Sequence, residues 1–319
     1  MDDRITFDPH KNLYINRIVD DVTFGVNEGE CLGLLGPNGA GKTTSISMIT
    51  GLLSHTHGNI VYGTHSLNCT EMADLSLGYC AQHDALWSLL TVKETLHFYL
   101  NICGYPKNEI PKYAKAMIEA CGIESHTNKR VNEISGGTKR KLSLLIAICS
   151  SPSYLILDEP SAGMDPFTRR YMWKLISELK KVRETATILT THSTEEAEAL
   201  CERIAILIKG RLVCVDTPKS IKMNHSNRYT LEVFTDNPEQ FEQEYVKNQN
   251  LFNLGPDDEN YELESSMNYQ KYSVKMNSES IANVFSVMEN AKENGIISQY
   301  NFGQYSLEQV FINFVNNTL

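Results

Sequence analysis

The sequence has no apolar run long enough to cross a lipid bilayer. A membrane-spanning helix needs about 18 or more mostly apolar residues in succession, and no run among the 319 residues approaches that length. Residues 1–4 also lack the charge and apolar pattern that begins a secretory signal peptide. We therefore expect that any action at a membrane takes place from outside the bilayer.

Excess positive charge and closely spaced cysteine pairs are absent as well. The 29 Lys and Arg residues are outnumbered by 39 Asp and Glu residues, and the net charge of −10 weakens any interpretation as a nucleic-acid binder. The 8 cysteines form no C-x-x-C pair, and several lie inside apolar runs. That distribution predicts reduced thiols in a cytosolic environment and no structural zinc. With 41% hydrophobic and 21% charged residues, the composition is that of an ordinary globular protein.

What the sequence does contain is a phosphate-binding motif, Gly36-Pro37-Asn38-Gly39-Ala40-Gly41-Lys42-Thr43. It fits the pattern G-x-x-x-x-G-K-[ST], follows the apolar run 31–35 and precedes a helix-like run at 44–49. Glycines let successive backbone N–H groups point into one anion-sized hollow, and the following helix adds the positive end of its dipole. We expect Lys42 to reach the β- and γ-phosphates of a nucleotide and the Thr43 hydroxyl to bind a magnesium ion.

Two carboxylates mark the second informative stretch. The apolar residues 154–157 predict a buried strand, and Asp158 and Glu159 follow at its carboxyl end. Sheets of α/β proteins place their ligands at that end of the strands. We expect Asp158 to hold the magnesium ion and Glu159 to accept a proton from an attacking water.

Two further polar residues end predicted strands. Gln82 follows the strand 77–81, and His192 follows the strand 187–191. Gln82 could contact a metal or orient a water, although alone it is equally compatible with a structural role. Because His192 lies at the same edge of the sheet as the other polar groups, it is expected to contact the γ-phosphate.

A second helix start with bare glycine amides lies at Ser135-Gly136-Gly137. Ser135 is predicted to cap the helix that follows, and the glycine N–H groups could form a second anion site. Simple capping without a ligand is the alternative. The next residues, Lys139, Arg140 and Lys141, are most simply explained as a solvated face of the helix.

The predicted elements divide the chain into a first domain at residues 1–220 and a second at residues 228–319. Within the first domain, residues 22–26 predict a strand, and about residues 86–145 form a mostly helical insert. The insert begins with an apolar cluster that is either core or a docking surface. This cluster comprises Trp87, Leu89 and Leu90.

Two capping boxes predict where helices begin. In each, a Thr or Ser is followed three residues later by a Glu, which allows the two residues to satisfy each other's backbone N–H groups. The pairs are Thr91 with Glu94 and Ser193 with Glu196.

The carboxyl-terminal part is richer in Asn, Gln and Glu and predicts the order β-α-β-β-α-β-α. Its predicted strands are 229–235, 261–265, 272–276 and 296–302, and its predicted helices are 238–247, 280–294 and 306–316. The polar stretch 222–228 before it predicts a linker. This part contains no catalytic cluster, and its pattern suggests a small α+β module for regulation or docking.

In this order, the motifs resemble those of the nucleotide-binding domain of an ATP-binding cassette (ABC) ATPase. The resemblance covers residue 5 to about residue 215. In the family's terms, residues 36–43 correspond to Walker A, Gln82 to the Q-loop glutamine and residues 134–138 to the signature. Asp158 corresponds to the end of Walker B and Glu159 to the catalytic carboxylate. Residues 161–165 correspond to the D-loop, and His192 corresponds to the switch histidine. One departure is Thr138, where the family usually has glutamine. Because backbone amides do most of the binding there, we expect no loss of activity.

The resemblance implies an α/β P-loop NTPase fold of ABC type, with a mixed sheet core and a helical insert, followed by a small α+β regulatory domain of ferredoxin-like type. It implies ATPase activity with ATP and Mg²⁺ as ligands. The implied catalytic residues are Glu159, His192 and Lys42, and the implied metal ligands are Thr43, Gln82 and Asp158. The implied nucleotide contacts are Tyr14, Gly36, Pro37, Asn38, Gly39, Ala40, Gly41, Lys42, Thr43, Thr44, Gln82, Ser135, Gly136 and Gly137. Tyr14 is the preferred aromatic for stacking on adenine, and Phe7 is the alternative.

The resemblance also implies partners. In this family the second anion site serves the nucleotide held by an opposing domain, so that two cassettes close over two ATP molecules. Residues 82–90 are expected to contact transmembrane domains, which would place the chain at the cytosolic face of a membrane. No nucleic-acid partner is expected.

Four stretches are similar to subfamily A, the large lipid exporters. They are residues 78–86, 139–143, 163–166 and 307–314. The chain then resembles the second, carboxyl-terminal cassette of such a transporter, and its tail corresponds to a cytosolic regulatory domain. Drug-efflux ATPases of bacteria share many of these motifs and remain the alternative. A soluble ABC ATPase acting on ribosomes or DNA and a catalytically silent cassette are disfavoured, because no basic surface is evident and all catalytic positions are filled.

Overall fold

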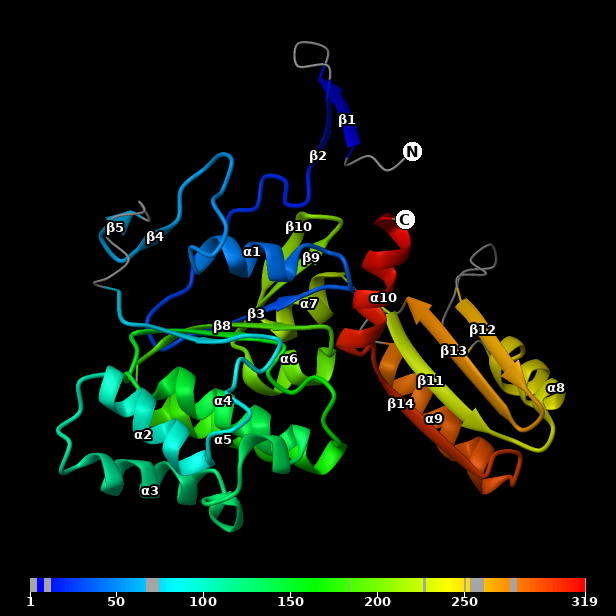
Figure 1. Cartoon of the computed structure of the whole chain (residues 1–319). Coiled ribbons are helices and arrows are strands. Elements are labelled where there is room, and N and C mark those ends of the chain that lie inside the picture. Colours follow the sequence, from blue (N-terminus) through cyan, green and yellow to red (C-terminus); the bar gives the residue numbers. More distant parts are fainter. Residues whose placement is uncertain are drawn as a thin grey trace. The chain divides into compact units, whose positions relative to one another are not determined.

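The computed structural model divides the chain into two compact units. It describes residues 5–8, 13–66, 75–182, 184–225, 228–249, 251–252, 261–275 and 280–318. The first unit comprises Met1–Thr217 and the second comprises Pro218–Asn317. Figure 1 shows the helices and strands of both. No described helix is both long enough and apolar enough to span a bilayer.

The first unit is built on a six-stranded mixed sheet with the strand order β10-β9-β3-β8-β7-β6. The strands are β3 (Cys31–Leu35), β6 (Leu77–Cys80), β7 (Tyr154–Asp158), β8 (Ala186–Thr191), β9 (Arg203–Ile208) and β10 (Arg211–Asp216). Strand β10 runs antiparallel to β9, and the other neighbouring strands run parallel. The apolar strand β3 is buried along its whole length, as expected for a parallel strand covered on both faces. The predicted α/β core with a mixed sheet is therefore confirmed.

Helices cover both faces of this sheet. They are α1 (Lys42–Ile49), α4 (Gly136–Ile148), α5 (Pro166–Val182) and α6 (Thr194–Leu200). Figure 1 shows α1 on one face and α4, α5 and α6 on the other. Helix α6 packs against β3 and β8, and α4 packs against β6. Because β3, β6, β7 and β8 are parallel, the polar residues that follow them meet at one edge of the sheet.

The segment before β3 is extended but contributes no strand to the large sheet. The strand predicted at residues 22–26 is wrong, because these residues form no ladder of backbone hydrogen bonds. Instead, Val22, Phe24 and Val26 pack against the core, and the residues between them are exposed. Their alternation reflects one-sided packing of an extended chain. The short strands β1 (Ile5–Asp8), β2 (Leu13–Asn16), β4 (Val61–Tyr62) and β5 (His65–Ser66) form two small antiparallel pairs.

The insert between β6 and β7 is helical, as predicted. It contains α2 (Val92–Ile102), α3 (Ile110–Ala120) and α4, with short 3₁₀ turns at Glu124–His126 and Val131–Glu133. The predicted capping box at Thr91 is formed: the Thr91 hydroxyl accepts from the Glu94 N–H at 3.2 Å, and the Glu94 carboxylate accepts from the Thr91 N–H at 2.8 Å. Helix α2 packs against both α3 and α4.

The second unit is a four-stranded antiparallel sheet with the order β12-β13-β11-β14. Its elements are β11 (Arg228–Phe234), α8 (Pro238–Phe241), a π-helical turn (Glu242–Lys247), β12 (Tyr261–Ser266), β13 (Tyr269–Lys275), α9 (Ser280–Glu293), β14 (Gln299–Gln304) and α10 (Leu307–Thr318). The predicted order of elements is present, and this strand order is that of a ferredoxin-like βαββαβ unit. Leu231, Val233, Tyr272, Val284 and Met288 form the centre of its core.

The predicted linker at residues 222–228 is in part wrong. Helix α7 (Pro218–His225) occupies most of it. Proline is favoured in the first turn of a helix, and Ile221 is fully buried, which anchors the short helix although most of its other residues are polar.

Candidate active site

The loop between β3 and α1 can be built only with glycine at several positions. Gly39 has φ of 79° and Gly41 has φ of 101°, which are left-handed conformations that other residues adopt with strain. A Cβ atom at Gly36 would collide with the carbonyl oxygen of Leu207. The loop therefore curls tightly and presents the first N–H groups of α1 to a ligand, which is the arrangement that binds phosphate.

Lys42 is the first residue of α1 and is 5% exposed. Its ammonium group donates to the carbonyl oxygens of Gly36 at 2.8 Å and Pro37 at 3.2 Å, and lies 3.6 Å from Oε1 of Glu159. Burial lowers the pKa of Lys42, and the carboxylates of Glu159 and Asp158 partly offset that effect. The side chain folds back over its own loop, with its charge at the place where a phosphate would bind.

Asp158 lies at the carboxyl end of β7 and is fully buried. One carboxylate oxygen accepts a hydrogen bond from the Thr190 hydroxyl, and the other has no partner among the described residues. Burial raises the pKa of Asp158, and the hydrogen bond from Thr190 partly opposes that shift. A buried carboxylate oxygen without a partner is a suitable ligand for a divalent cation.

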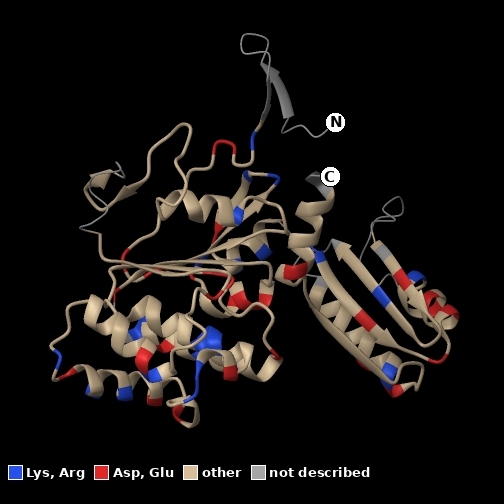
Figure 2. Cartoon of the chain, in the orientation of Figure 1, with Lys and Arg blue, Asp and Glu red and all other residues tan. Residues whose placement is uncertain are grey.

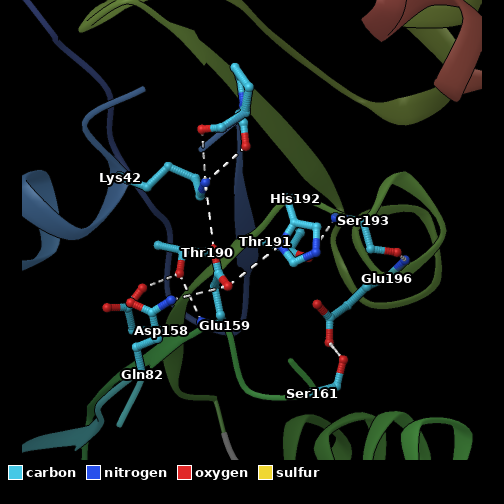
Figure 3. A network of polar contacts seen from close by, with 12 residues as sticks. Lys42, Gln82, Asp158, Glu159, Ser161, Thr190, Thr191, His192, Ser193 and Glu196 are labelled. Carbon is cyan, nitrogen blue, oxygen red and sulfur yellow. Dashed lines mark hydrogen bonds and ion pairs between the residues drawn. The ribbon is translucent and has the colours of Figure 1, made fainter. Parts of the chain in front are cut away.

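Glu159 follows in a left-handed turn with φ of 47°. Its N–H donates to the carbonyl oxygen and to the hydroxyl of Thr190, at 3.1 and 2.9 Å. Its carboxylate lies 3.6 Å from Lys42 and 3.5 Å from Nδ1 of His192, and it accepts from the Gln82 amide at 3.3 Å. Figure 3 shows the side chains of Lys42, Gln82 and His192, which come from three separate segments, converging on this one carboxylate.

A cavity of about 320 Å³ adjoins the loop. It is lined by Ile18, Asn38, Gly39, Ala40, Gly41, Lys42, Thr43, Thr44, Gln82 and Glu159. Its lining combines the predicted phosphate-binding residues with two of the polar residues that end strands. Thr43, Gln82 and Asp158 offer hydroxyl, amide and carboxylate oxygens, which are the donors that Mg²⁺ prefers, so the predicted metal ligands fit the ion.

Comparison with known proteins identifies a family. Residues 19–162 match the ABC transporter family. These residues belong to this family.

Three relatives each match this chain over 93% of the chain's length. It is 40% identical to ATP-binding cassette sub-family A member 13 of Homo sapiens, 37% identical to the phospholipid-transporting ATPase ABCA3 of Homo sapiens and 36% identical to the retinal-specific phospholipid-transporting ATPase ABCA4 of Bos taurus. The chain spans only 6%, 17% and 13% of these relatives, respectively. An alignment of 303 residues or more must include much of the second unit.

Solved structures agree with the fold of an ABC cassette. An ATP-binding subunit of an ABC transporter is 28% identical, with a TM-score of 0.58, and the match covers 65% of this chain and 86% of that one. A bacterial ABC transporter cassette in a dimeric structure has a TM-score of 0.59 at 22% identity, and the match covers 67% of this chain and 95% of that one. At that identity, the second match shows the fold alone.

Not all of the nucleotide contacts expected of the ABC cassette are found among the described residues that line this cavity. The backbone of Tyr14 belongs to β2, but its side chain and that of Phe7 lie outside the described residues. Ile18, which sequence patterns gave no reason to select, does line the cavity. Ser135, Gly136 and Gly137 are not part of the lining and lie instead at the start of α4.

Ser135 caps α4, as predicted. Its hydroxyl accepts from the N–H of Thr138 at 3.3 Å and lies 2.9 Å from the Thr138 hydroxyl. The first N–H groups of a helix have no partner within the helix, and Ser135 and Gly136 are exposed. The ABC signature therefore presents open donors to a ligand, and Thr138, which replaces the usual glutamine, helps to hold the cap.

Arg140 does not belong to a solvated face, and that prediction is wrong. The side chain is only 5% exposed, and it donates to carbonyl oxygens of the Gln82 loop and of the turn at Glu159. Helix α4 is buried on more than one side, between the insert and β6. The sequence signal was present but ambiguous, because a basic residue in a largely buried helix requires acceptors.

The capping box predicted at Ser193 is half formed. The Ser193 hydroxyl accepts from the N–H of Glu196 at 3.3 Å. The buried Glu196 carboxylate points elsewhere: it accepts from the hydroxyl of Ser161 at 2.5 Å and from the indole N–H of Trp173 at 3.0 Å. The helix that follows His192 is thus tied to the D-loop, a link that sequence spacing could not reveal.

Proposed function

We propose that this chain binds MgATP and hydrolyses it to drive transport by a membrane protein of which it forms one cassette. The observation that carries the proposal is the convergence of Lys42, Gln82 and His192 on the carboxylate of Glu159 beside the phosphate-binding loop. A carboxylate held in this way can accept a proton from water that attacks the γ-phosphate. The match of residues 19–162 to the ABC transporter family supports the same conclusion.

Different groups of the chain have different roles in phosphoryl transfer. The N–H groups at the start of α1 and the ammonium of Lys42 bind and orient the phosphates. Glu159 orients the water and takes its proton, and His192 donates a hydrogen bond to the γ-phosphate. The residues that would hold a Mg²⁺ ion are Thr43, Gln82 and Asp158, and the ion would neutralise negative charge on the phosphates.

A second cassette completes the site in this proposal. The open N–H groups at Ser135, Gly136 and Gly137 do not line the cavity at Lys42. They are therefore free to bind the nucleotide of an opposing cassette, whose own signature would close over this chain's cavity. A bacterial ABC transporter cassette that shares this fold has a dimeric structure, which supports pairing of this chain with another cassette.

The start of the insert is our proposed docking surface for transmembrane domains. Trp87 is 49% exposed and Leu89 is 72% exposed. Large apolar side chains that are exposed together often mark an interaction site. The Trp87 ring packs edge-on against Phe98 at 4.5 Å and stacks on Tyr99 at 6.0 Å, which gives the patch a rigid base. Gln82 lies a few residues before it, so docking and hydrolysis share one segment. The proposed location is the cytosolic face of a membrane.

We propose that the molecules transported are lipids. Two of the relatives are named phospholipid-transporting ATPases, and each match includes much of this chain's second unit. An ATPase subunit of a drug-efflux transporter is the alternative, and a soluble ABC ATPase is less favoured. Figure 2 shows acidic and basic residues interspersed along the described part of the chain, whereas a nucleic-acid binder usually gathers basic residues together.

A regulatory role is proposed for the second unit. It has its own core and an antiparallel sheet, as a separately folded module would. It holds none of the residues expected to take part in catalysis. A module of this kind adjusts the closure of a cassette without contributing to the chemistry.

The test of the proposed ATPase is a Glu159→Gln variant of this chain. It should bind a fluorescent ATP analogue with an affinity within about threefold of the wild type, while its hydrolysis rate falls on the order of a hundredfold or more. Glu184 is exposed, so Glu184→Gln is a matched control that should leave both values unchanged. Brisk hydrolysis by Glu159→Gln would refute the role of Glu159.

A further inference from the structure

Arg140 holds the turn that carries the two functional carboxylates. Its Nη2 donates to the carbonyl oxygens of Asp158 at 2.6 Å and Glu159 at 3.0 Å. Its Nε donates to the carbonyl oxygen of Pro160 at 3.0 Å. Three successive carbonyl groups of one turn are therefore fixed by one planar guanidinium.

The same guanidinium also holds the loop that follows β6. Its Nη1 donates to the carbonyl oxygens of Ala81 and Gln82, and it lies 3.4 Å from a carboxylate oxygen of Asp84. That oxygen accepts a second hydrogen bond, at 2.8 Å, from the hydroxyl of Ser143 on the same helix as Arg140. All three nitrogens of the side chain are thus engaged by two loops at the edge of the sheet.

The turn at Glu159 needs such support. A non-glycine residue with φ of 47° is in a sparsely populated, strained conformation that persists only where neighbours hold it. Thr190 holds the N–H side of this turn, and Arg140 holds its carbonyl side. The direction in which the Glu159 carboxylate points depends on both.

We propose that Arg140 is a positioning residue for ATP hydrolysis, fixing Glu159 and Gln82 to the helix that begins with the signature. Arg140 does not line the cavity, so it acts through the residues that do. Because α4 begins at Ser135-Gly136-Gly137, a nucleotide bound at that helix start and the alignment of Glu159 in the same chain are connected through one side chain. This inference rests on the proposed function.

An Arg140→Lys variant of the full chain tests the proposal. Lysine keeps the charge but loses the planar fork, so it cannot hold both loops at once. We expect kcat to fall about tenfold or more, because misplacement of a catalytic group is costly, with KM for ATP and the affinity for a fluorescent ATP analogue within about threefold. Lys139 makes no side-chain hydrogen bond or ion pair within the described residues, and Lys139→Met should leave kcat within about twofold.

The comparison that separates positioning from a general structural effect is a double-mutant cycle with Glu159→Gln. If Arg140 acts through Glu159, then Arg140→Lys should change the residual single-turnover rate of Glu159→Gln by less than about twofold. An equal tenfold loss in both backgrounds, or a raised KM with kcat unchanged, overturns the proposal. Thermal unfolding of each variant shows whether the fold is retained.

A milder variant covers the case in which Arg140→Lys fails to fold. Asp84→Asn weakens one anchor of the guanidinium, and it should lower kcat about two- to fivefold with KM unchanged. Unchanged kcat in that variant overturns the inference. A wild-type chain that binds no MgATP refutes the proposed function itself, whereas normal hydrolysis by both wild type and Arg140→Lys refutes only the role of Arg140.

Discussion

The ammonium nitrogen of Lys42 lies 3.6 Å from a carboxylate oxygen of Glu159, and the two side chains are 5% and 9% exposed. The phosphate-binding loop and the end of β7 are thereby joined through opposite charges in a poorly solvated place. The charge of each group is largely balanced by the charge of the other. A γ-phosphate that enters the cavity must therefore compete with Glu159 for the ammonium group of Lys42. Binding of the nucleotide therefore changes the surroundings of the group that accepts the proton.

Replacing Lys42 by Met should cost stability as well as activity. The buried carboxylate of Glu159 loses its cation, which we expect to lower the free energy of unfolding by about 1–3 kcal/mol, and hydrolysis should fall about a hundredfold or more. The Lys42→Met/Glu159→Gln double variant should regain part of the lost stability, because no uncompensated charge remains. Urea unfolding measures both effects, and strictly additive losses would contradict a charge interaction between the two residues.

The stability of the chain should depend on pH through Asp158. Burial raises the pKa of Asp158 above its usual value of 3.8, so the folded chain holds this proton more tightly than the unfolded chain does. Stability contributed by this group is then greatest below pH 3.8 and is lost as the pH rises through the folded pKa. At neutral pH the ionised carboxylate destabilises the chain that carries no metal.

Asp158→Asn should therefore be more stable than the wild type at pH 7, by about 1 kcal/mol or about 2–4 °C in Tm. This advantage should shrink as the pH falls towards 4, while Mg²⁺-dependent hydrolysis is lost at every pH. Urea unfolding between pH 4 and pH 7 is the measurement. Parallel stability curves for variant and wild type would show that Asp158 does not titrate as described.

Thr190 links the two carboxylate residues and should matter for both stability and rate. Its hydroxyl donates to Asp158 and accepts from the N–H of Glu159. Thr190→Val has almost the same volume, and we expect it to cost about 1–3 kcal/mol of stability and about tenfold in kcat.

The matched control for Thr190 is Thr187→Val on the same strand. Thr187 is also buried, but within the described part of the chain its hydroxyl makes only a long hydrogen bond, 3.4 Å, to the carbonyl oxygen of Thr185. Its kcat should stay within about twofold of the wild type. If both variants lose activity equally, strand packing rather than the hydroxyl of Thr190 sets the rate.

Glu196→Ala should loosen the link between the D-loop and α6. The variant leaves the hydroxyl of Ser161 and the indole N–H of Trp173 without their shared acceptor, which should cost about 1–3 kcal/mol. Glu195 is exposed on the same helix, and Glu195→Ala should cost less than about 1 kcal/mol. Thermal unfolding and Trp173 fluorescence report the difference, and equal Tm values for the two variants would contradict the buried link.

The sequence allowed prediction of those parts of the site that lie within one short segment. Residues 36–43 have a spacing that only a phosphate-binding loop requires, and the carboxylates after an apolar strand mark one edge of a parallel sheet. The capping box at Thr91 was also predictable, because both its partners lie within one helical turn. Arg140 and Glu196 were not, because their partners come from distant segments.

Sequence by itself determined that the chain has an ABC cassette, since the phosphate-binding loop, the paired carboxylates and the helix starts depend on local backbone chemistry. Only the tertiary structure decided which buried polar side chains support that chemistry. A charged residue inside the protein must find acceptors wherever folding brings them, and their identity depends on which strands and helices become neighbours. For this reason Arg140, which resembles a surface residue in the sequence, lies between the two loops that carry Gln82 and Glu159.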